Sequence, residues 1–220
     1  MKLLEAFIFD LDGVLTDTAE YHFQAWKRMA DEEGIPFNRQ DNEQLRGVSR
    51  RASLELILKD TTFPEAKIQE LMERKNNYYR ELITQITKND LLPGAVELLK
   101  ELKSRSFKLA LASASKNAPL VVKKLSIISF FDALADGHSV SKTKPAPDLF
   151  LYAAKQLNKP PAKCIVVEDA EAGIEAAKTA NMWTIGIGPR TRVGAADFIY
   201  QSVAEIEVDK LLQRMSQQSQ

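Results

Sequence analysis

The sequence predicts an α/β fold, a doubly wound parallel sheet with an α-helical domain inserted after its first strand. Two observations support this prediction. In the later part of the chain, short apolar runs alternate with helical segments, an order typical of right-handed βαβ units and a parallel sheet. Between residues 17 and 86, the Val- and Ile-rich runs disappear, and apolar residues recur at helical spacing instead.

The first strand is expected at residues 6–9, an apolar run typical of a strand buried on both faces. The inserted segment contains four helical stretches, which we infer from apolar spacing and from capping residues. They lie around residues 22–30, 42–45, 49–58 and 64–83. We therefore expect a four-helix cap domain at residues 16–87 and a discontinuous core at residues 1–15 and 88–220.

Beyond residue 94 the chain alternates between helices and strands. Helices are expected at residues 95–104, 118–125, 147–157 and 172–180. Strands are expected at residues 107–112, 133–135, 165–168, 184–187 and 198–199. Because consecutive βαβ units build one sheet, the first strand must join these later strands, and this makes the core discontinuous in sequence.

The 220-residue chain is balanced in charge, with 30 Lys and Arg against 30 Asp and Glu, and 45% of its residues are hydrophobic. This composition supplies a sizeable core, but no basic surface of the kind that binds nucleic acid or an anionic membrane. The lone cysteine, Cys164, excludes an internal disulfide and lies in an apolar run, as a small core residue would. No apolar run approaches the about 18 residues of a membrane span, so we expect a soluble cytoplasmic monomer.

Two aspartates end the first predicted strand. A single residue separates Asp10 from Asp12, so in extended backbone their side chains point the same way. A hard cation between them would relieve both their repulsion and their desolvation, and ligands of open α/β sheets bind at the carboxyl ends of strands. The alternative is an ordinary strand end, because Asp and Gly are common turn residues.

Polar residues also follow later strands. Ser113 could present a hydroxyl to a phosphate or merely cap a helix. Lys144 could balance phosphoryl charge or be a solvated loop lysine, and Lys142 is its rival. Glu168 and Asp169 could bind a metal ion or be acids favoured by a helix dipole.

These segments, taken in order, resemble the four motifs of the haloacid dehalogenase superfamily. The first motif is Asp-Leu-Asp-Gly-Val-Leu-Thr-Asp from residue 10, and the others contain Ser113, Lys144-Pro145 and Glu168-Asp169. The resemblance implies a Rossmann-like core, with Asp10 as the nucleophile that becomes an aspartyl-phosphate and Asp12 as the general acid/base. It also implies that Ser113 and Lys144 contact the transferring phosphoryl group.

The same resemblance implies a Mg²⁺ cofactor. Its ligands would be the carboxylates of Asp10, Glu168 and Asp169 and the main-chain carbonyl of Asp12. Ala170 stands where the family usually has serine, which removes a hydroxyl contact. The family pattern suggests a cis bond before Pro145, although most X-Pro bonds are trans.

Four stretches, residues 16–26, 43–50, 74–77 and 111–117, resemble the β-phosphoglucomutase family within this superfamily. The resemblance extends over nearly the whole chain, cap and core alike. It implies a Mg-dependent isomerase that interconverts β-D-glucose 1-phosphate and D-glucose 6-phosphate through an aspartyl-phosphate enzyme and β-glucose 1,6-bisphosphate. Such a mutase needs a second phosphate site, and the bidentate fork of Arg50 suits it. The substrate-binding residues implied are Thr18, His22, Arg46, Gly47, Arg50, Lys75, Ser115, Lys116 and Asn117.

Several of these assignments have competing interpretations. Residues 16–18 are expected to be the hinge of a closing cap, and His22 is expected to couple closure to Asp12. His22 could equally be a satisfied core histidine, and Lys75 a solvated lysine on a charged helix. Arg46 stands where the family often has lysine, and the two cations hydrogen-bond differently. A sugar-phosphate phosphatase and an inactive binding protein on the same fold are the alternative functions.

Overall fold

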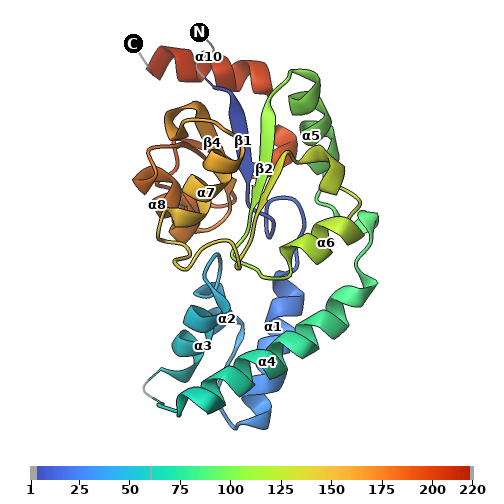
Figure 1. The fold of residues 1–220 in the computed structure, drawn as a ribbon, viewed down its shortest axis with the longest axis vertical. Coiled ribbons are helices and arrows are strands. Elements are labelled where there is room, and N and C mark those ends of the chain that lie inside the picture. Colours follow the sequence, from blue (N-terminus) through green and yellow to red (C-terminus); the bar gives the residue numbers. More distant parts are fainter. Residues whose placement is uncertain (1–3, 60, 219–220) are drawn as a thin grey trace.

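The computed structural model describes residues 4–59 and 61–218. The ends of the expected core, residues 1–3 and 219–220, and residue 60 of the expected cap lie outside the described residues. Within the described part, six parallel strands form one sheet, as predicted (Figure 1). Their spatial order is β3 (Ala133–Ala135), β2 (Lys108–Ala112), β1 (Ala6–Phe9), β4 (Cys164–Glu168), β5 (Trp183–Ile187) and β6 (Phe198–Tyr200).

The first strand of the chain lies at the centre of the sheet. Phe7 in β1 pairs with Leu109 on one side and with Ile165 on the other. The strand order therefore reverses at β1, and in open α/β sheets a ligand binds at such a switch point, outside the carboxyl ends of the strands. Asp10 follows β1 directly, and Asp169 follows β4.

Helices cover both faces of the sheet. Successive β1 side chains point to opposite faces, so each face has its own buried cluster. Phe7 and Phe9 belong to one buried cluster with residues of α5 (Ala95–Ser104), α6 (Ala118–Lys124) and α10 (Val208–Gln218). Ala6 and Ile8 belong to a second cluster with residues of α7 (Asp148–Gln156) and α8 (Glu171–Thr179). A sheet buried on both faces explains why its strands read as continuous apolar runs.

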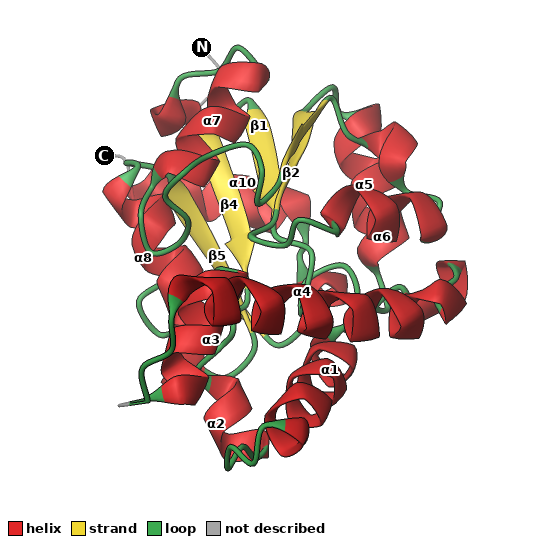
Figure 2. Cartoon of the chain, turned by 60° about the horizontal axis from the view of Figure 1, so that its bottom comes forward, coloured by secondary structure: helices red, strands yellow, loops and turns green. Residues whose placement is uncertain are grey.

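The segment between β1 and β2 begins with helices that have a hydrophobic cluster of their own. These helices are α1 (Ala19–Glu32), α2 (Arg39–Glu43), α3 (Arg50–Leu58) and α4 (Glu65–Leu82). Trp26, Met29, Leu54 and Leu71 are among the residues of this cluster. Figures 1 and 2 show these helices beyond the carboxyl ends of the strands, where they face the switch point. We call this group of helices the cap; the domain boundaries given above stay a prediction.

The two chain connections between core and cap lie side by side. Thr16 forms an isolated bridge with Leu91, the Leu92 N–H donates to the Leu15 carbonyl over 2.9 Å, and the Thr16 hydroxyl donates to the Asp90 carbonyl over 2.7 Å. The expected hinge at residues 16–18 is therefore held against the chain that returns from the cap.

Two helices were not expected from the sequence, α9 (Arg190–Val193) and α10. Short 3-10 turns also occur, at residues 83–85, 88–90, 128–130, 161–163 and 203–205. No helix among residues 4–59 and 61–218 has the length and apolar character that crossing a bilayer requires.

Candidate active site

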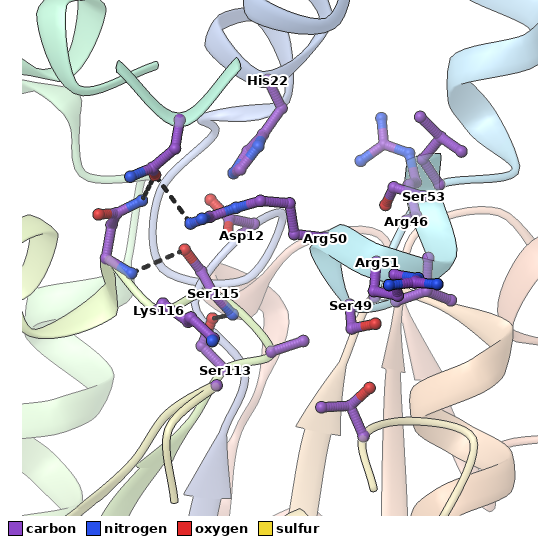
Figure 3. Close-up of a pocket in the computed structure, with 18 of the residues that line it drawn as sticks. Asp12, His22, Arg46, Ser49, Arg50, Arg51, Ser53, Ser113, Ser115 and Lys116 are labelled. Carbon is purple, nitrogen blue, oxygen red and sulfur yellow. Dashed lines mark hydrogen bonds between the residues drawn. The ribbon is translucent and has the colours of Figure 1, made fainter. Parts of the chain in front are cut away.

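A cavity of about 620 Å³ lies between the carboxyl ends of the strands and the cap. Asp10, Asp12 and Ser113 line it from the core, and His22 and Arg50 line it from the cap. Figure 3 shows His22 and Arg50 on the cap side, with Ser113, Ser115 and Lys116 on the core side. The cavity thus brings together residues that are far apart in sequence.

Lys144 is buried among carboxylates at the core end of this site. Its Nζ donates to Asp10 Oδ1 over 2.5 Å and to Glu168 Oε2 over 2.7 Å, and its side chain is 0% exposed. Lys142 is exposed and is not among the residues that line the cavity, so Lys144 and not its rival Lys142 occupies this position. The Lys144-Pro145 bond is cis, which confirms the family-based expectation.

The core end holds more negative than positive charge. Burial and the nearby Asp10 carboxylate raise the pKa of both Glu168 and Asp169, although Lys144 counteracts part of the increase. The pKa of Lys144 is raised, because Asp10 and Glu168 outweigh the opposing effect of burial. One buried lysine is therefore shared by several buried acids.

The three acids can hold a metal ion. Carboxylate oxygens of Asp10, Glu168 and Asp169 all lie within 4.8 Å of one another, and an all-oxygen donor set suits a hard divalent cation. Glycines make room for this cluster: a Cβ on Gly13, where φ is 76°, would lie 2.2 Å from Asp169 Oδ2, and a Cβ on Gly173 would lie 2.1 Å from Glu168. The residues present therefore fit a divalent metal.

Asp12 lies beside this cluster and is tied to the cap. Thr18 Oγ1 donates to Asp12 Oδ1, and the Tyr79 hydroxyl donates to Thr18 Oγ1 over 3.3 Å. Burial and the neighbouring Asp10 raise the pKa of Asp12 to about 7, although the Thr18 hydrogen bond opposes this shift. A carboxyl with a pKa near neutrality can both give and take a proton. Sequence reasoning missed Tyr79.

The loop after β2 supplies short polar residues. Ser113 is buried, its hydroxyl accepts from the Ser115 N–H over 3.2 Å, and the Ser115 hydroxyl accepts from the Asn117 N–H over the same distance. These bonds fold the loop so that Ser113, Ser115, Lys116 and Asn117 all line the cavity. Lys116 is exposed.

His22 and Lys75 form a pair on the cap wall. Lys75 Nζ lies 2.8 Å from His22 Nδ1, and the His22 ring stacks on Tyr79 at a centroid distance of 4.0 Å. Lys75 is 2% exposed, so the solvated-lysine alternative is wrong. Burial lowers the pKa of both groups, and the nearby cations lower them further. The Asp12 carboxylate opposes only part of the shift in the pKa of Lys75. Two groups whose charged forms are disfavoured therefore face the cavity.

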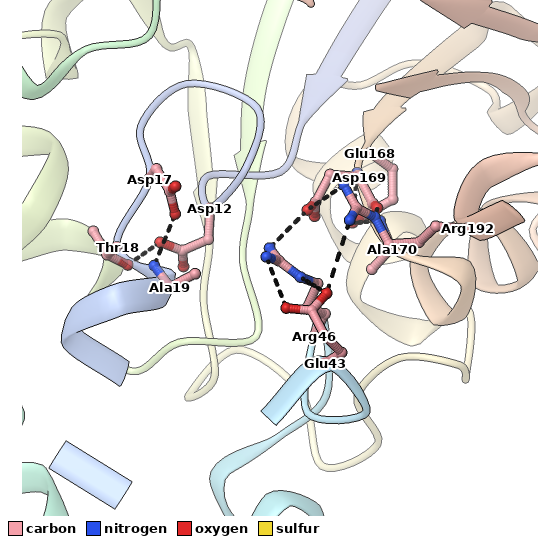
Figure 4. Close-up of polar contacts among 10 residues, drawn as sticks. All are labelled: Asp12, Asp17, Thr18, Ala19, Glu43, Arg46, Glu168, Asp169, Ala170 and Arg192. Atoms are coloured by element: carbon pink, nitrogen blue, oxygen red, sulfur yellow. Dashed lines mark hydrogen bonds and ion pairs between the residues drawn. The ribbon is translucent and has the colours of Figure 1, made fainter. Parts of the chain in front are cut away.

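Arg46 connects the cap to the acid cluster. It pairs with Glu43 over 2.9 Å and with Asp169 Oδ2 over 3.2 Å, as Figure 4 shows. Arg192 donates to the Asp169 carbonyl over 2.6 Å and approaches Glu43 at 3.9 Å. Gly47, with φ at 73°, turns the chain after Arg46 and lines the cavity. Sequence reasoning missed Arg192.

Arg50 points across the cavity and has a different partner. Its Nη2 donates to the side-chain oxygen of Asn76 over 2.8 Å, and the same oxygen accepts from Asn117 Nδ2 over 2.9 Å. Burial lowers the pKa of Arg50. Asn76 was not among the expected site residues.

The structure thus brings the expected residues to one place. Three of them, Thr18, Lys144 and Glu168, do not line the cavity but contact residues that do. The others line the cavity itself: Asp10, Asp12, His22, Arg46, Gly47, Arg50, Lys75, Ser113, Ser115, Lys116, Asn117 and Asp169. Their chemical roles stay predictions.

Comparisons with known proteins agree with this geometry. The family model of the haloacid dehalogenase-like hydrolases matches residues 4–181. A β-phosphoglucomutase of Bacillus subtilis is 46% identical over 218 residues, which cover 97% of this chain and 96% of that protein. A phosphorylated carbohydrates phosphatase of Thermotoga maritima is 30% identical, over 95% of this chain and 97% of that protein.

The structural comparison gives the same result. The crystal structure of a β-phosphoglucomutase from Clostridium difficile superposes with a TM-score of 0.94 at 43% identity, over 98% of this chain and 99% of that one. The chain belongs to the haloacid dehalogenase-like hydrolase family.

Proposed function

We propose that this chain has β-phosphoglucomutase activity and interconverts β-D-glucose 1-phosphate and D-glucose 6-phosphate. The observation that carries the proposal is a cavity with two unlike ends: an acid cluster around Asp10, and Arg50, which pairs with no carboxylate of the described residues. A mutase needs both, because its substrate carries one phosphate that reacts and one that is only held. The near full-length identity to the Bacillus subtilis enzyme supports the same reaction.

The first half of the reaction starts from phosphorylated Asp10. The 6-hydroxyl oxygen of β-glucose 1-phosphate attacks the phosphorus, its proton passes to the Asp12 carboxylate, and the bond from phosphorus to the Asp10 oxygen breaks. The products are β-glucose 1,6-bisphosphate and free Asp10. A pKa of about 7 suits Asp12 to this general base role.

In the second half, the bisphosphate turns so that its other phosphate faces the core. An Asp10 oxygen attacks that phosphorus, and the bond to the C1 oxygen breaks. Asp12 returns its proton to this oxygen, which gives glucose 6-phosphate and restores phosphorylated Asp10. Ser113 and Lys144 are proposed to hold the transferring group, and Lys144 is already 2.5 Å from the nucleophile.

We propose Mg²⁺ as the cofactor, held by the Asp10, Glu168 and Asp169 carboxylates and the Asp12 main-chain carbonyl. When bound, Mg²⁺ neutralises charge on the transferring phosphoryl group. The cap residues have proposed roles as well. Those roles are phosphate binding by Arg50, Ser115, Lys116 and Asn117, and sugar binding and cap closure by Thr18, His22, Arg46, Gly47 and Lys75.

A paired product assay tests the activity. The protein is given Mg²⁺, a trace of β-glucose 1,6-bisphosphate and either β- or α-glucose 1-phosphate, and glucose 6-phosphate and free phosphate are followed together. We expect glucose 6-phosphate from the β-anomer alone, with little free phosphate. Phosphate release without isomerisation would instead support a sugar-phosphate phosphatase, the activity in the name of the Thermotoga maritima relative.

Other expectations stay predictions: the preference for glucose, the monomeric state, the cytoplasmic location and the lack of a nucleic-acid partner. The near-zero formal charge supports the last of these, because it offers no general attraction to polyanions.

A further inference from the structure

One amide oxygen accepts hydrogen bonds from both sides of the cavity. Asn76 Oδ1, in α4 of the cap, accepts from Arg50 in α3 over 2.8 Å and from Asn117 of the core loop over 2.9 Å. A carbonyl oxygen has two lone pairs, and both are used here. The two donors are thereby held at one point, where core and cap meet.

Of the two donors, Arg50 differs from the two neighbouring arginines that line the cavity. Arg46 pairs with Glu43 and Asp169, and Arg51 pairs with Glu55 and Glu65. Among residues 4–59 and 61–218, no carboxylate pairs with Arg50. A half-buried guanidinium that bonds only to a neutral amide keeps most of its affinity for an anion.

We propose that Asn76 is a positioning residue for the phosphate that does not react. Its oxygen orients Arg50 and Asn117 before substrate arrives. When a sugar phosphate enters, both donors exchange their hydrogen bond to Asn76 for hydrogen bonds to phosphate oxygens. The inference rests on the proposed mutase function and adds to it a residue that is neither a phosphate ligand nor a catalytic group. Preorganised donors lower the cost of ordering side chains on binding.

The neutrality of Asn76 is part of the inference. An amide oxygen is a strong enough acceptor to orient a guanidinium, but a phosphate dianion displaces it easily. A carboxylate at the same position would form a charge-assisted pair with Arg50 and would repel the incoming phosphate. Asn76 therefore combines orientation with release, which neither alanine nor aspartate can do.

The test uses the full-length protein with four variants: Asn76→Ala, Asn76→Asp, Arg50→Ala and the double variant Asn76→Ala with Arg50→Ala. Asn77→Ala is the matched control, since Asn77 is the next residue of α4 and is exposed. The mutase assay gives KM for β-glucose 1-phosphate and kcat for each protein. Thermal unfolding of each variant shows that it is folded.

We expect Asn76→Ala to raise KM about five- to tenfold, the effect of one lost hydrogen bond, with a much smaller change in kcat. Asn76→Asp should raise KM further, and Asn77→Ala should change it less than about twofold. In the Arg50→Ala background, Asn76→Ala should raise KM clearly less than it does in the unaltered protein, because only its effect through Asn117 remains.

Two results would overturn the inference: an unchanged KM in Asn76→Ala, or an equal increase in KM with and without Arg50. A purely structural role of Asn76 would give the second result. Failure of the proposed function is separate, since it would appear in the unaltered protein as absence of glucose 6-phosphate.

Discussion

Two buried lysines, one in the core and one in the cap, differ in the partners that surround their charge. Lys144 in the core is 2% exposed and bonds to Asp10 and Glu168. Lys75 in the cap is 2% exposed, contacts His22 at 2.8 Å, and lies 4.7 Å from the centroid of the Trp26 ring. Burial opposes the charge of both, but only Lys144 has carboxylates that overcome this effect. The pKa is raised for Lys144 and lowered for Lys75.

The difference indicates what each end of the cavity lacks. The core end has a surplus of carboxylates, so it needs a cation. At the cap end, no carboxylate in the described part of the chain bonds to Lys75 or Arg50, so this end needs an anion. A metal ion at one end and a phosphate at the other would complete both. The ligand is therefore expected to bridge two oppositely charged sites.

The largest effect is expected from Asp10→Asn. An amide cannot serve as the phosphoryl acceptor, so turnover should fall by at least about 10⁴-fold. The mutase assay measures this loss, and an unchanged unfolding midpoint would show that the variant is folded. Full turnover in Asp10→Asn would contradict the nucleophile assignment and return the binding-protein alternative to consideration.

Lys144→Met tests the core half of the comparison. The substitution leaves Asp10 and Glu168 buried without their cation, and breaking a buried pair in this way costs about 3–5 kcal/mol. For a chain of this length, that corresponds to a melting temperature lower by roughly 6–20 °C. Thermal unfolding without metal measures it. A melting temperature equal to that of the unaltered protein would show that the buried acids do not need Lys144.

Lys75→Met is expected to act in the opposite direction. The long apolar side chain of methionine replaces a buried cation to which no carboxylate of the described residues bonds. This should increase the unfolding free energy by about 1–2 kcal/mol near pH 7. The same substitution should raise KM for β-glucose 1-phosphate, since the cap loses a positive charge. Urea unfolding and the mutase assay measure the two effects, and a destabilised Lys75→Met would contradict the comparison.

The pH dependence gives a second check on Lys75. Its pKa is lowered in the folded protein from the ordinary value of 10.5. Between the two values, the unfolded chain binds more protons than the folded one, so stability rises with pH. The stability difference between Lys75→Met and the unaltered protein should therefore shrink as the pH is raised from neutrality towards that ordinary value.

The smallest effect is expected at a lysine–carboxylate cluster in contact with solvent. Burial raises the pKa of Asp132, but hydrogen bonds from the Leu109 N–H, Lys108 and Lys103 outweigh it and lower the pKa from 3.8 to about 2. Asp132→Ala should cost about 1 kcal/mol or less, because solvent screens these charges.

The contribution of Asp132 has a defined pH range. Since the folded pKa is depressed, the stabilisation is fully present above about pH 4 and is lost as the pH falls through about 2. Urea unfolding of both proteins across this range measures it. A difference that persists in strong acid would show that Asp132 acts through packing and not through its charge.

Most of the sheet was predictable from the sequence, because strands buried on both faces are apolar runs with sharp ends. The ranges 6–9, 95–104 and 133–135 agree with the structure at both ends. The short cap helix was misplaced: it was expected at 42–45 and lies at Arg39–Glu43, where Asn38 caps it. Helix α10 was missed, although Val208, Leu211 and Met215 have helical spacing and are buried.

The candidate site was predictable where chemistry follows a strand end. Asp10, Lys144 and Glu168 belong to motifs with recognisable neighbours in the sequence. Tyr79 and Arg192 do not, because their contribution depends on contacts between distant segments. Asn76 lies in a stretch of polar helix residues, and only the fold brings it to Arg50 and Asn117.

The central position of β1 has a consequence for how the protein is made. Phe7 pairs with Leu109 and Ile165, which a ribosome adds about 100 and about 160 residues later. At about 5–20 residues per second, the first strand synthesised waits about 8–30 s for its second neighbour. Until Leu109 is added, an apolar run of four residues has open edges on both sides, and one edge stays open until Ile165 is added. The segment that later lies at the centre of the sheet is therefore exposed to pairing with other chains during translation.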